Sequence, residues 1–121
     1  MSAKALEIVR AACLHAREAG LTLNRGPWFV FDADNNPTAC CAIGAVLYQA
    51  ETPFPADLSN PGYVQAACAL LGVDVFWLQR WWLGWDRGHQ VTLIHEKDGK
   101  SFETKDDISK SALALAREFK V

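Results

Sequence analysis

Residues 38–49, TACCAIGAVLYQ, predict a helix that is buried among the other elements of the fold. Thr38 is of a residue type that caps helix N-termini, so we expect the helix to begin there, with Cys40 and Cys41 in its first turn. The side chains that follow are apolar on two adjacent helical faces, which indicates burial. Gly44 indicates that another element approaches this helix closely.

The adjacent cysteines have four candidate roles: a nucleophile, half of a disulfide, metal ligands or small packing residues. A helix N-terminus favours a thiolate, which keeps the nucleophile role open for Cys40. A bridge between neighbouring cysteines is strained, and no C-x-x-C or H-x-x-x-H spacing supports a metal site. We therefore expect free thiols, no metal and no other cofactor, with Cys41 packed beside Gly44.

Upstream of this helix, the sequence predicts one more helix and a strand. An apolar stripe at helical spacing runs through the first twenty residues, and Gly20 is a typical helix end. Its members are Leu6, Val9, Cys13 and Ala16. The aromatic and β-branched residues at 28–31 then favour a strand.

The segment DADNNP at 32–37 has two interpretations. Asp32, Asp34 and Asn36 match the alternate oxygen ligands of the first half of a calcium loop. Pro37 stands where that loop needs its glycine, and Ile43 stands where a bidentate glutamate belongs. A plain Asp/Asn/Pro turn is the interpretation we favour.

After a proline-rich loop at 51–62, a third helix is predicted from Asn60, with Pro61 at its first position and Gly72 at its end. A fourth follows in DVFWLQRWWLGWDRG, residues 74–88, where tryptophans recur every fourth residue. Either its rings lie in the core, or one edge is exposed for a partner. The residues of that candidate surface are Arg80, Trp81, Trp82, Asp86 and Arg87.

Residues 90–103 predict a β-hairpin, because apolar and polar side chains alternate around Asp98-Gly99, a strong two-residue turn signal. Thr104 with Asp107 resembles a capping box for a last helix. We therefore expect a single α+β domain over residues 1–121, with about five helices packed on a small antiparallel sheet. That sheet would contain the strand near 28–31 and the hairpin near 90–103.

Composition and charge exclude several functional classes. The chain has 121 residues, half of them hydrophobic, with a formal net charge of −2 and no cluster of Lys and Arg, so nucleic acid is not an expected partner. No apolar run reaches the length of a membrane span, and the N-terminus lacks the apolar region of a signal peptide. We expect a cytoplasmic protein with no membrane partner.

Several of these segments together resemble a known family. The succession of elements resembles a family of small bacterial proteins of unknown function: an N-terminal helix, a short strand with Trp28, the segments DADNNP and CCAIGAV, the later GWDRG and a final Ala/Leu-rich helix. That family has a Cys-Ala-x-Gly-Ala-Leu helix and a Trp-Asn-Asp turn, where this chain has Trp85, Asp86 and Arg87. The resemblance implies an architecture and no activity, and it implies packing roles for Cys41 and Gly44.

Two functional hypotheses follow. In the first, the chain is a non-enzymatic interaction module, an accessory or inhibitor protein of a bacterium or phage, which binds another protein or a second copy of itself through the tryptophan-rich helix. The alternative is a papain-like cysteine peptidase or amidase with Cys40 as nucleophile, His89 as base and Asp106 orienting that base. No upstream Gln or Asn is an obvious oxyanion donor, so we favour the interaction module.

Overall fold

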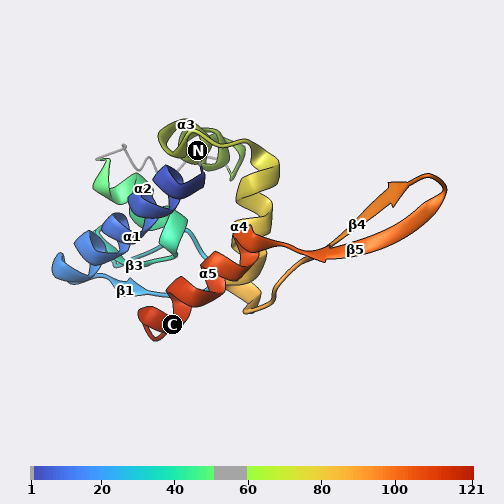
Figure 1. The fold of residues 1–121 in the computed structure, drawn as a ribbon. Helices are drawn as coiled ribbons and strands as arrows, with labels where there is room; N and C mark the ends of the chain where they lie inside the picture. Colours follow the sequence, from blue (N-terminus) through green and yellow to red (C-terminus); the bar gives the residue numbers. More distant parts are fainter. Residues whose placement is uncertain (1, 51–59) are drawn as a thin grey trace. The chain divides into compact units, whose positions relative to one another are not determined.

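The computed structural model describes residues 2–50 and 60–121, and within these residues the α+β class is confirmed. The elements in chain order are α1 (Ser2–Glu18), β1 (Thr22–Leu23), β2 (Phe29–Phe31), β3 (Pro37–Cys40), α2 (Ala42–Gln49), α3 (Asn60–Leu71), α4 (Val75–Arg87), β4 (Thr92–Lys97), β5 (Lys100–Lys105) and α5 (Asp107–Glu118) (Figure 1). Most of the predicted proline-rich loop lies outside the described residues.

Contacts divide the chain into two compact units. The first runs to Val75 and includes Val121, and the second runs from Phe76 to Lys120. The expectation of a single domain stays a prediction.

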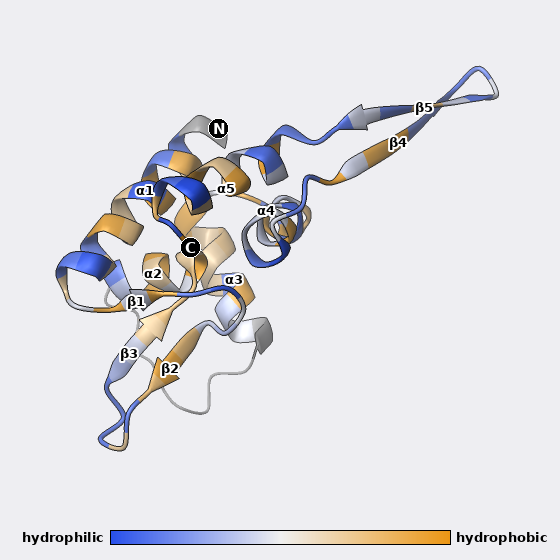
Figure 2. Cartoon of the chain, turned by 90° about the horizontal axis from the view of Figure 1, so that it is seen from below, coloured by the Kyte–Doolittle hydropathy of each residue, from blue (hydrophilic) through white to orange (hydrophobic). Residues whose placement is uncertain are grey.

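The core of the first unit forms where α1 packs against α2. The predicted stripe of α1 is buried at Val9, Cys13 and Ala16, and α2 is buried along almost its whole length. Figure 2 shows the corresponding pattern, with hydrophilic and hydrophobic residues interleaved along α1 and mainly hydrophobic residues in α2. Burying one apolar stripe per helix provides the main stabilisation of such a unit.

The first unit also holds a three-stranded sheet in the order β1-β3-β2. β1 pairs with β3 in parallel, and β2 pairs with β3 antiparallel, with Val30 opposite Ala39. The predicted turn connects β2 to β3: the Asp32 side chain accepts hydrogen bonds from the backbone N–H groups of Asp34 and Asn36, both at 2.9 Å. Because this connection is short, the strand near 28–31 pairs with its neighbour in sequence, and its expected place in one sheet with the hairpin is wrong.

The start of α2 differs from the prediction. Thr38 and Cys40 belong to β3, and the cap is Cys41, whose Sγ accepts a hydrogen bond from the Gly44 N–H at 3.3 Å. Gly44 lies against Trp28, where a Cβ atom would overlap the backbone carbonyl oxygen, so the predicted close approach is confirmed.

The second unit contains α4, the hairpin and α5. The hairpin pairs β4 with β5 from Thr92↔Lys105 to Lys97↔Lys100 and closes through the predicted Asp98-Gly99 turn, in which both residues have positive φ. The cap of α5 is Asp106, whose Oδ2 accepts a hydrogen bond from the Ser109 N–H at 2.8 Å. The predicted capping box is wrong, because Thr104 lies in β5 and its hydroxyl bonds to His95.

Candidate functional site

The two faces of α4 differ in exposure. Trp77, Leu78, Trp81 and Trp85 are buried, and the Trp81 and Trp85 rings stack with centroids 5.5 Å apart. On the other side, the side chains of Phe76 and Leu83 are 69% and 36% exposed, and Trp82 is half-buried. At about 100° per residue, positions 77, 81 and 85 share one face and position 82 lies beyond its edge. Trp81 is therefore a core residue, and its predicted place in a partner surface is corrected.

A shallow hollow of about 380 Å³ lies on the exposed side of α4. Its lining residues, Gln79, Trp82, Leu83, Asp86 and Arg87, fall at the i, i+3, i+4, i+7 and i+8 positions of one helical face. Together with Phe76, we call these residues the α4 surface. It includes three of the five residues predicted for partner binding, and it adds Phe76, Gln79 and Leu83. The signal for these was their helical spacing from Trp82.

Arg80, the remaining predicted contact residue, has a structural partner. Its Nη1 lies 3.5 Å from Oδ1 of Asp106, which is buried, and its guanidinium carbon lies 6.0 Å from the centre of the Phe76 ring. Arg80 therefore connects the base of the α4 surface to the cap of α5.

Asp106 is also the residue that fixes the hairpin to α5. Its backbone N–H donates to the Val91 carbonyl at 2.9 Å, and the Val91 N–H donates to the Ser109 hydroxyl at 2.8 Å. Since one carboxylate oxygen faces Arg80 and the other caps α5, these contacts explain Asp106 as a structural residue.

The candidate nucleophile Cys40 is fully buried in β3. Burial raises the pKa of its thiol from 9.0 to about 12, so the thiol is protonated at neutral pH. His89, the candidate base, is exposed and forms no hydrogen bond within the described part of the chain. Cys40 belongs to the first unit, and His89 and Asp106 belong to the second. These observations give no support to an activated thiolate, and the proposed catalytic roles remain untested.

The other cysteines also have packing environments. All four are free; Cys13 and Cys41 are buried, and Cys68 is half-buried. The pKa of the Cys68 thiol is raised, mainly by burial and to a smaller extent by the negative charge of Asp74. Within residues 2–50 and 60–121, no group of three or more His, Cys, Asp or Glu side chains is placed to hold a metal ion.

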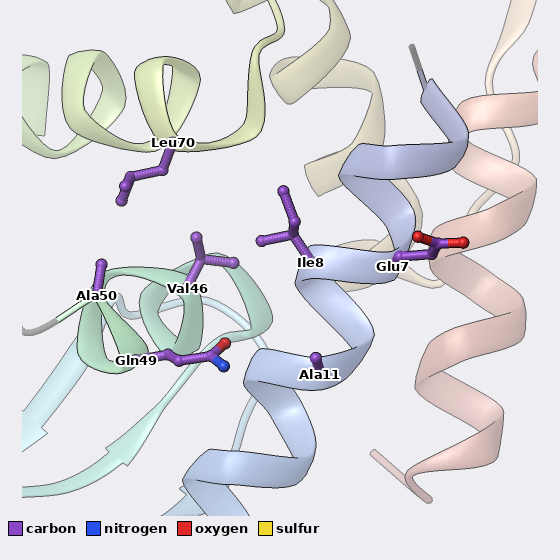
Figure 3. A pocket seen from close by; sticks show the side chains of 7 residues that line it. All are labelled: Glu7, Ile8, Ala11, Val46, Gln49, Ala50 and Leu70. Carbon is purple, nitrogen blue, oxygen red and sulfur yellow. The ribbon is translucent and has the colours of Figure 1, made fainter.

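A second hollow, of about 360 Å³, lies in the first unit between α1, α2 and α3 (Figure 3). Ile8, Val46 and Leu70 line it, and the Glu7 carboxylate points away from the other lining side chains. This hollow was not predicted from the sequence, although Leu70 is an exposed apolar residue of α3. Its lining is mainly apolar, and its polar members, Glu7 and Gln49, do not form a set of converging catalytic groups.

Comparison with family models, with curated proteins and with solved structures finds no match to this chain. The resemblance to the small bacterial family stays a prediction. In the part of the chain that is described, no helix has the length and apolar character needed to cross a membrane.

Proposed function

We propose that this chain is a non-enzymatic protein-interaction module that binds its partner through the α4 surface. The observation that carries the proposal is the exposure of Phe76 and Leu83 on the side of α4 where Leu83 and the half-buried Trp82 line a hollow. Contiguous apolar side chains exposed on a helix are typical of surfaces that bind other proteins.

The chemistry of the α4 surface supports a protein as the ligand. Tryptophan and arginine contribute a large share of the binding energy in protein interfaces, and here Trp82 and Arg87 line the same hollow. Asp86 adds a negative charge beside them. The surface therefore offers one acidic and one basic side chain around an apolar centre. A partner that inserts an apolar side chain and surrounds it with polar groups fits this arrangement.

The α4 surface is also held on a rigid support. The opposite face of α4 is buried, and Gly84 packs so closely on α5 that a Cβ atom would overlap the Ser109 carbonyl oxygen. A surface that is ordered before binding loses less entropy when the complex forms. The proposal extends to a cytoplasmic accessory or inhibitor protein encoded by a bacterium or its phage, which is compatible with four free cysteines.

The alternative, a cysteine peptidase or amidase, has less support. It requires a thiolate at Cys40, whereas burial raises the pKa of this thiol to about 12. It also requires a carboxylate that orients His89, whereas both oxygens of Asp106 have structural partners.

Photo-crosslinking in the cells that express the chain tests the proposal. Leu83 is replaced by benzoylphenylalanine, and the matched control carries the same substitution at Leu14, an apolar residue of α1 that is 45% exposed. We expect one discrete crosslinked protein from position 83, none from position 14, and loss of the product when Phe76→Asp is added. Equal crosslinking from both positions, or none from position 83, contradicts the proposal.

A further inference from the structure

The β4–β5 hairpin is the most exposed element of the second unit. Leu93 is half-buried, and every other residue of the two strands is exposed, including Ile94 at 74% and Phe102 at 48%. Figure 1 shows the hairpin extending away from α4 and α5. The sheet has two strands, so within the described residues no strand covers the outer edge of either. Isolated two-stranded hairpins are marginally stable in water, and uncovered edges can pair with another chain.

The register shows which residues could pair across the outer edge of β5. A two-residue turn makes Lys97 and Lys100 a hydrogen-bonded pair, and such pairs alternate with non-hydrogen-bonded pairs along an antiparallel ladder. The peptide groups of Phe102 therefore face β4. Those of Ser101 and Glu103 point outward and are available to a further strand.

A second copy of β5 fits this edge in antiparallel orientation when the two-fold axis passes between the two Phe102 residues. Ser101 then lies opposite Glu103 of the second copy, and Lys100 lies opposite its Thr104, so no two like charges face each other. Shifting the axis to Glu103 opposes two carboxylates, and shifting it to Ser101 opposes Phe102 with Lys100. An axis at Thr104 would place Glu103 opposite Lys105 of the second copy, but it would pair only residues 103–105 of β5, whereas the Phe102 axis pairs residues 100–104. Like charges directly opposite are destabilising, and aromatic pairs are stabilising, so the longest favourable pairing is centred on Phe102.

The Phe102 axis also extends the stack of the His95 and Phe102 rings that is present within each hairpin. The His95 and Phe102 rings stack with centroids 5.0 Å apart, and His95 Nε2 lies 2.7 Å from the Thr104 hydroxyl oxygen. Across the new seam the two Phe102 side chains form a non-hydrogen-bonded pair, in which side chains approach most closely. The β4 edge offers less. An axis at Ile94 makes its apolar self-pair a hydrogen-bonded pair, where the strands hold side chains farther apart, and an axis at Leu93 pairs only residues 92–94 of β4.

We propose that the chain forms a two-fold symmetric dimer in which β5 of each copy pairs antiparallel with β5 of the other, centred on Phe102. The two hairpins then make a four-stranded sheet with a row of four rings on one face. Pairing a strand with itself closes the assembly at two copies, whereas pairing β4 with β5 of a second copy does not close. This interface uses none of the residues of the α4 surface.

A matched pair of proline variants tests the dimer. Glu103 and Ile94 are register partners, and each points its N–H group away from the hairpin, Glu103 on the β5 edge and Ile94 on the β4 edge. Proline is tolerated at such edge positions, but it cannot donate to a further strand. By light scattering after size exclusion we expect twice the 13.4 kDa chain mass for the unmodified chain and Ile94→Pro, and the single mass for Glu103→Pro. An unmodified chain that is monomeric, or a dimer lost with Ile94→Pro alone, overturns the proposal.

Disulfide trapping gives a second test that keeps the hairpin intact. In a Cys68→Ser background, the Phe102→Cys variant should give a covalent dimer under mild oxidation, because the α-carbons of a non-hydrogen-bonded pair lie within disulfide range. The Ile94→Cys variant should remain monomeric on a non-reducing gel. Equal trapping of the two variants, or trapping of Ile94→Cys alone, overturns the proposed register. Because the α4 crosslinking uses different residues, the failure of one proposal is distinguishable from the failure of the other.

Discussion

At the scale of single residues, Gly44 and Gly84 each lie against a backbone carbonyl oxygen of a neighbouring segment. The partner is Trp28 for Gly44 and Ser109 for Gly84, and in both cases a Cβ atom would overlap the oxygen. Backbone atoms cannot move aside as flexible side chains do, so these two contacts require glycine.

We predict that Gly44→Ala and Gly84→Ala each lower the free energy of unfolding by about 1–3 kcal/mol, although alanine is usually the better helix former by about 0.5–1 kcal/mol. Urea denaturation followed by circular dichroism measures this difference. Gln79→Ala, on the exposed side of α4, is the control and should stay within about 0.5 kcal/mol of the parent chain. A Gly84→Ala variant as stable as the parent would mean that α4 and α5 are not in such close contact.

The environment of Cys40 predicts both its reactivity and a pH dependence. Burial raises the pKa of its thiol above the usual value, so alkylation of the native protein should label the half-buried Cys68 well before Cys40. Peptide mapping after a timed reaction at pH 8 separates the two sites. Rapid labelling of Cys40, slowed by His89→Ala, would instead support the hydrolase hypothesis.

The same shift links stability to alkaline pH. The pKa of the Cys40 thiol is about 12 in the folded state and 9.0 in the unfolded state. This group therefore contributes stability that is complete below pH 9 and is lost as the pH rises toward 12. We predict that Tm falls between pH 9 and pH 11, and that it falls less in Cys40→Ala. Parallel Tm profiles for the two proteins would contradict the assignment.

Sequence reasoning identified some residue environments and missed others. The close approach at Gly44 was predictable, because a glycine among large apolar residues in a helix usually lies where another segment packs against the backbone. The burial of Trp81 was open, because four tryptophans and two leucines around one helix give no sharp boundary between its faces. The packing on α4 decides that Trp81 is buried and that Trp82 lies at the edge.

At the scale of elements, the helices followed from periodicity, whereas β3 was missed. Pro37–Cys40 has no alternation that distinguishes it from the first turn of the apolar helix that follows, so the helix was expected to begin three residues before its cap at Cys41. Its strand conformation depends on pairing with β1 and β2, which is a tertiary effect. The hairpin turn, in contrast, is encoded locally by Asp98-Gly99 and was predicted correctly.

The cap of α5 leads to an element-level prediction. Asp106→Ala removes the cap and leaves Arg80 without its carboxylate partner, so we expect a loss of about 1–3 kcal/mol in the free energy of unfolding. Asp107→Ala, the neighbouring exposed carboxylate in the first turn of α5, should lose less than about 1 kcal/mol. Thermal or chemical denaturation of the two variants measures the difference, and equal losses would contradict the role of Asp106.

At the scale of the whole molecule, the α+β class was predictable and the division of the strands between two sheets was not. The strand near 28–31 and the hairpin both have the composition of strands, but composition does not encode which strands pair. The short DADNNP connection favoured local pairing of β2 with β3, and the hairpin was left as a sheet of its own. A candidate interaction surface could be located on α4 from the sequence, but its members depended on which side of that helix is buried.

The most direct test of the interaction module uses the partner protein that is crosslinked through position 83. Its affinity is measured for the parent chain and for variants of the α4 surface. We predict that Trp82→Ala weakens this affinity about 30-fold or more, since truncating a central interface tryptophan typically costs about 2 kcal/mol or more. Leu14→Ala, on α1, should leave the affinity unchanged, and unaltered circular dichroism spectra should show that both chains fold. If Trp82→Ala binds the partner as tightly as the parent chain, the α4 surface is not the binding site and the proposed function is wrong.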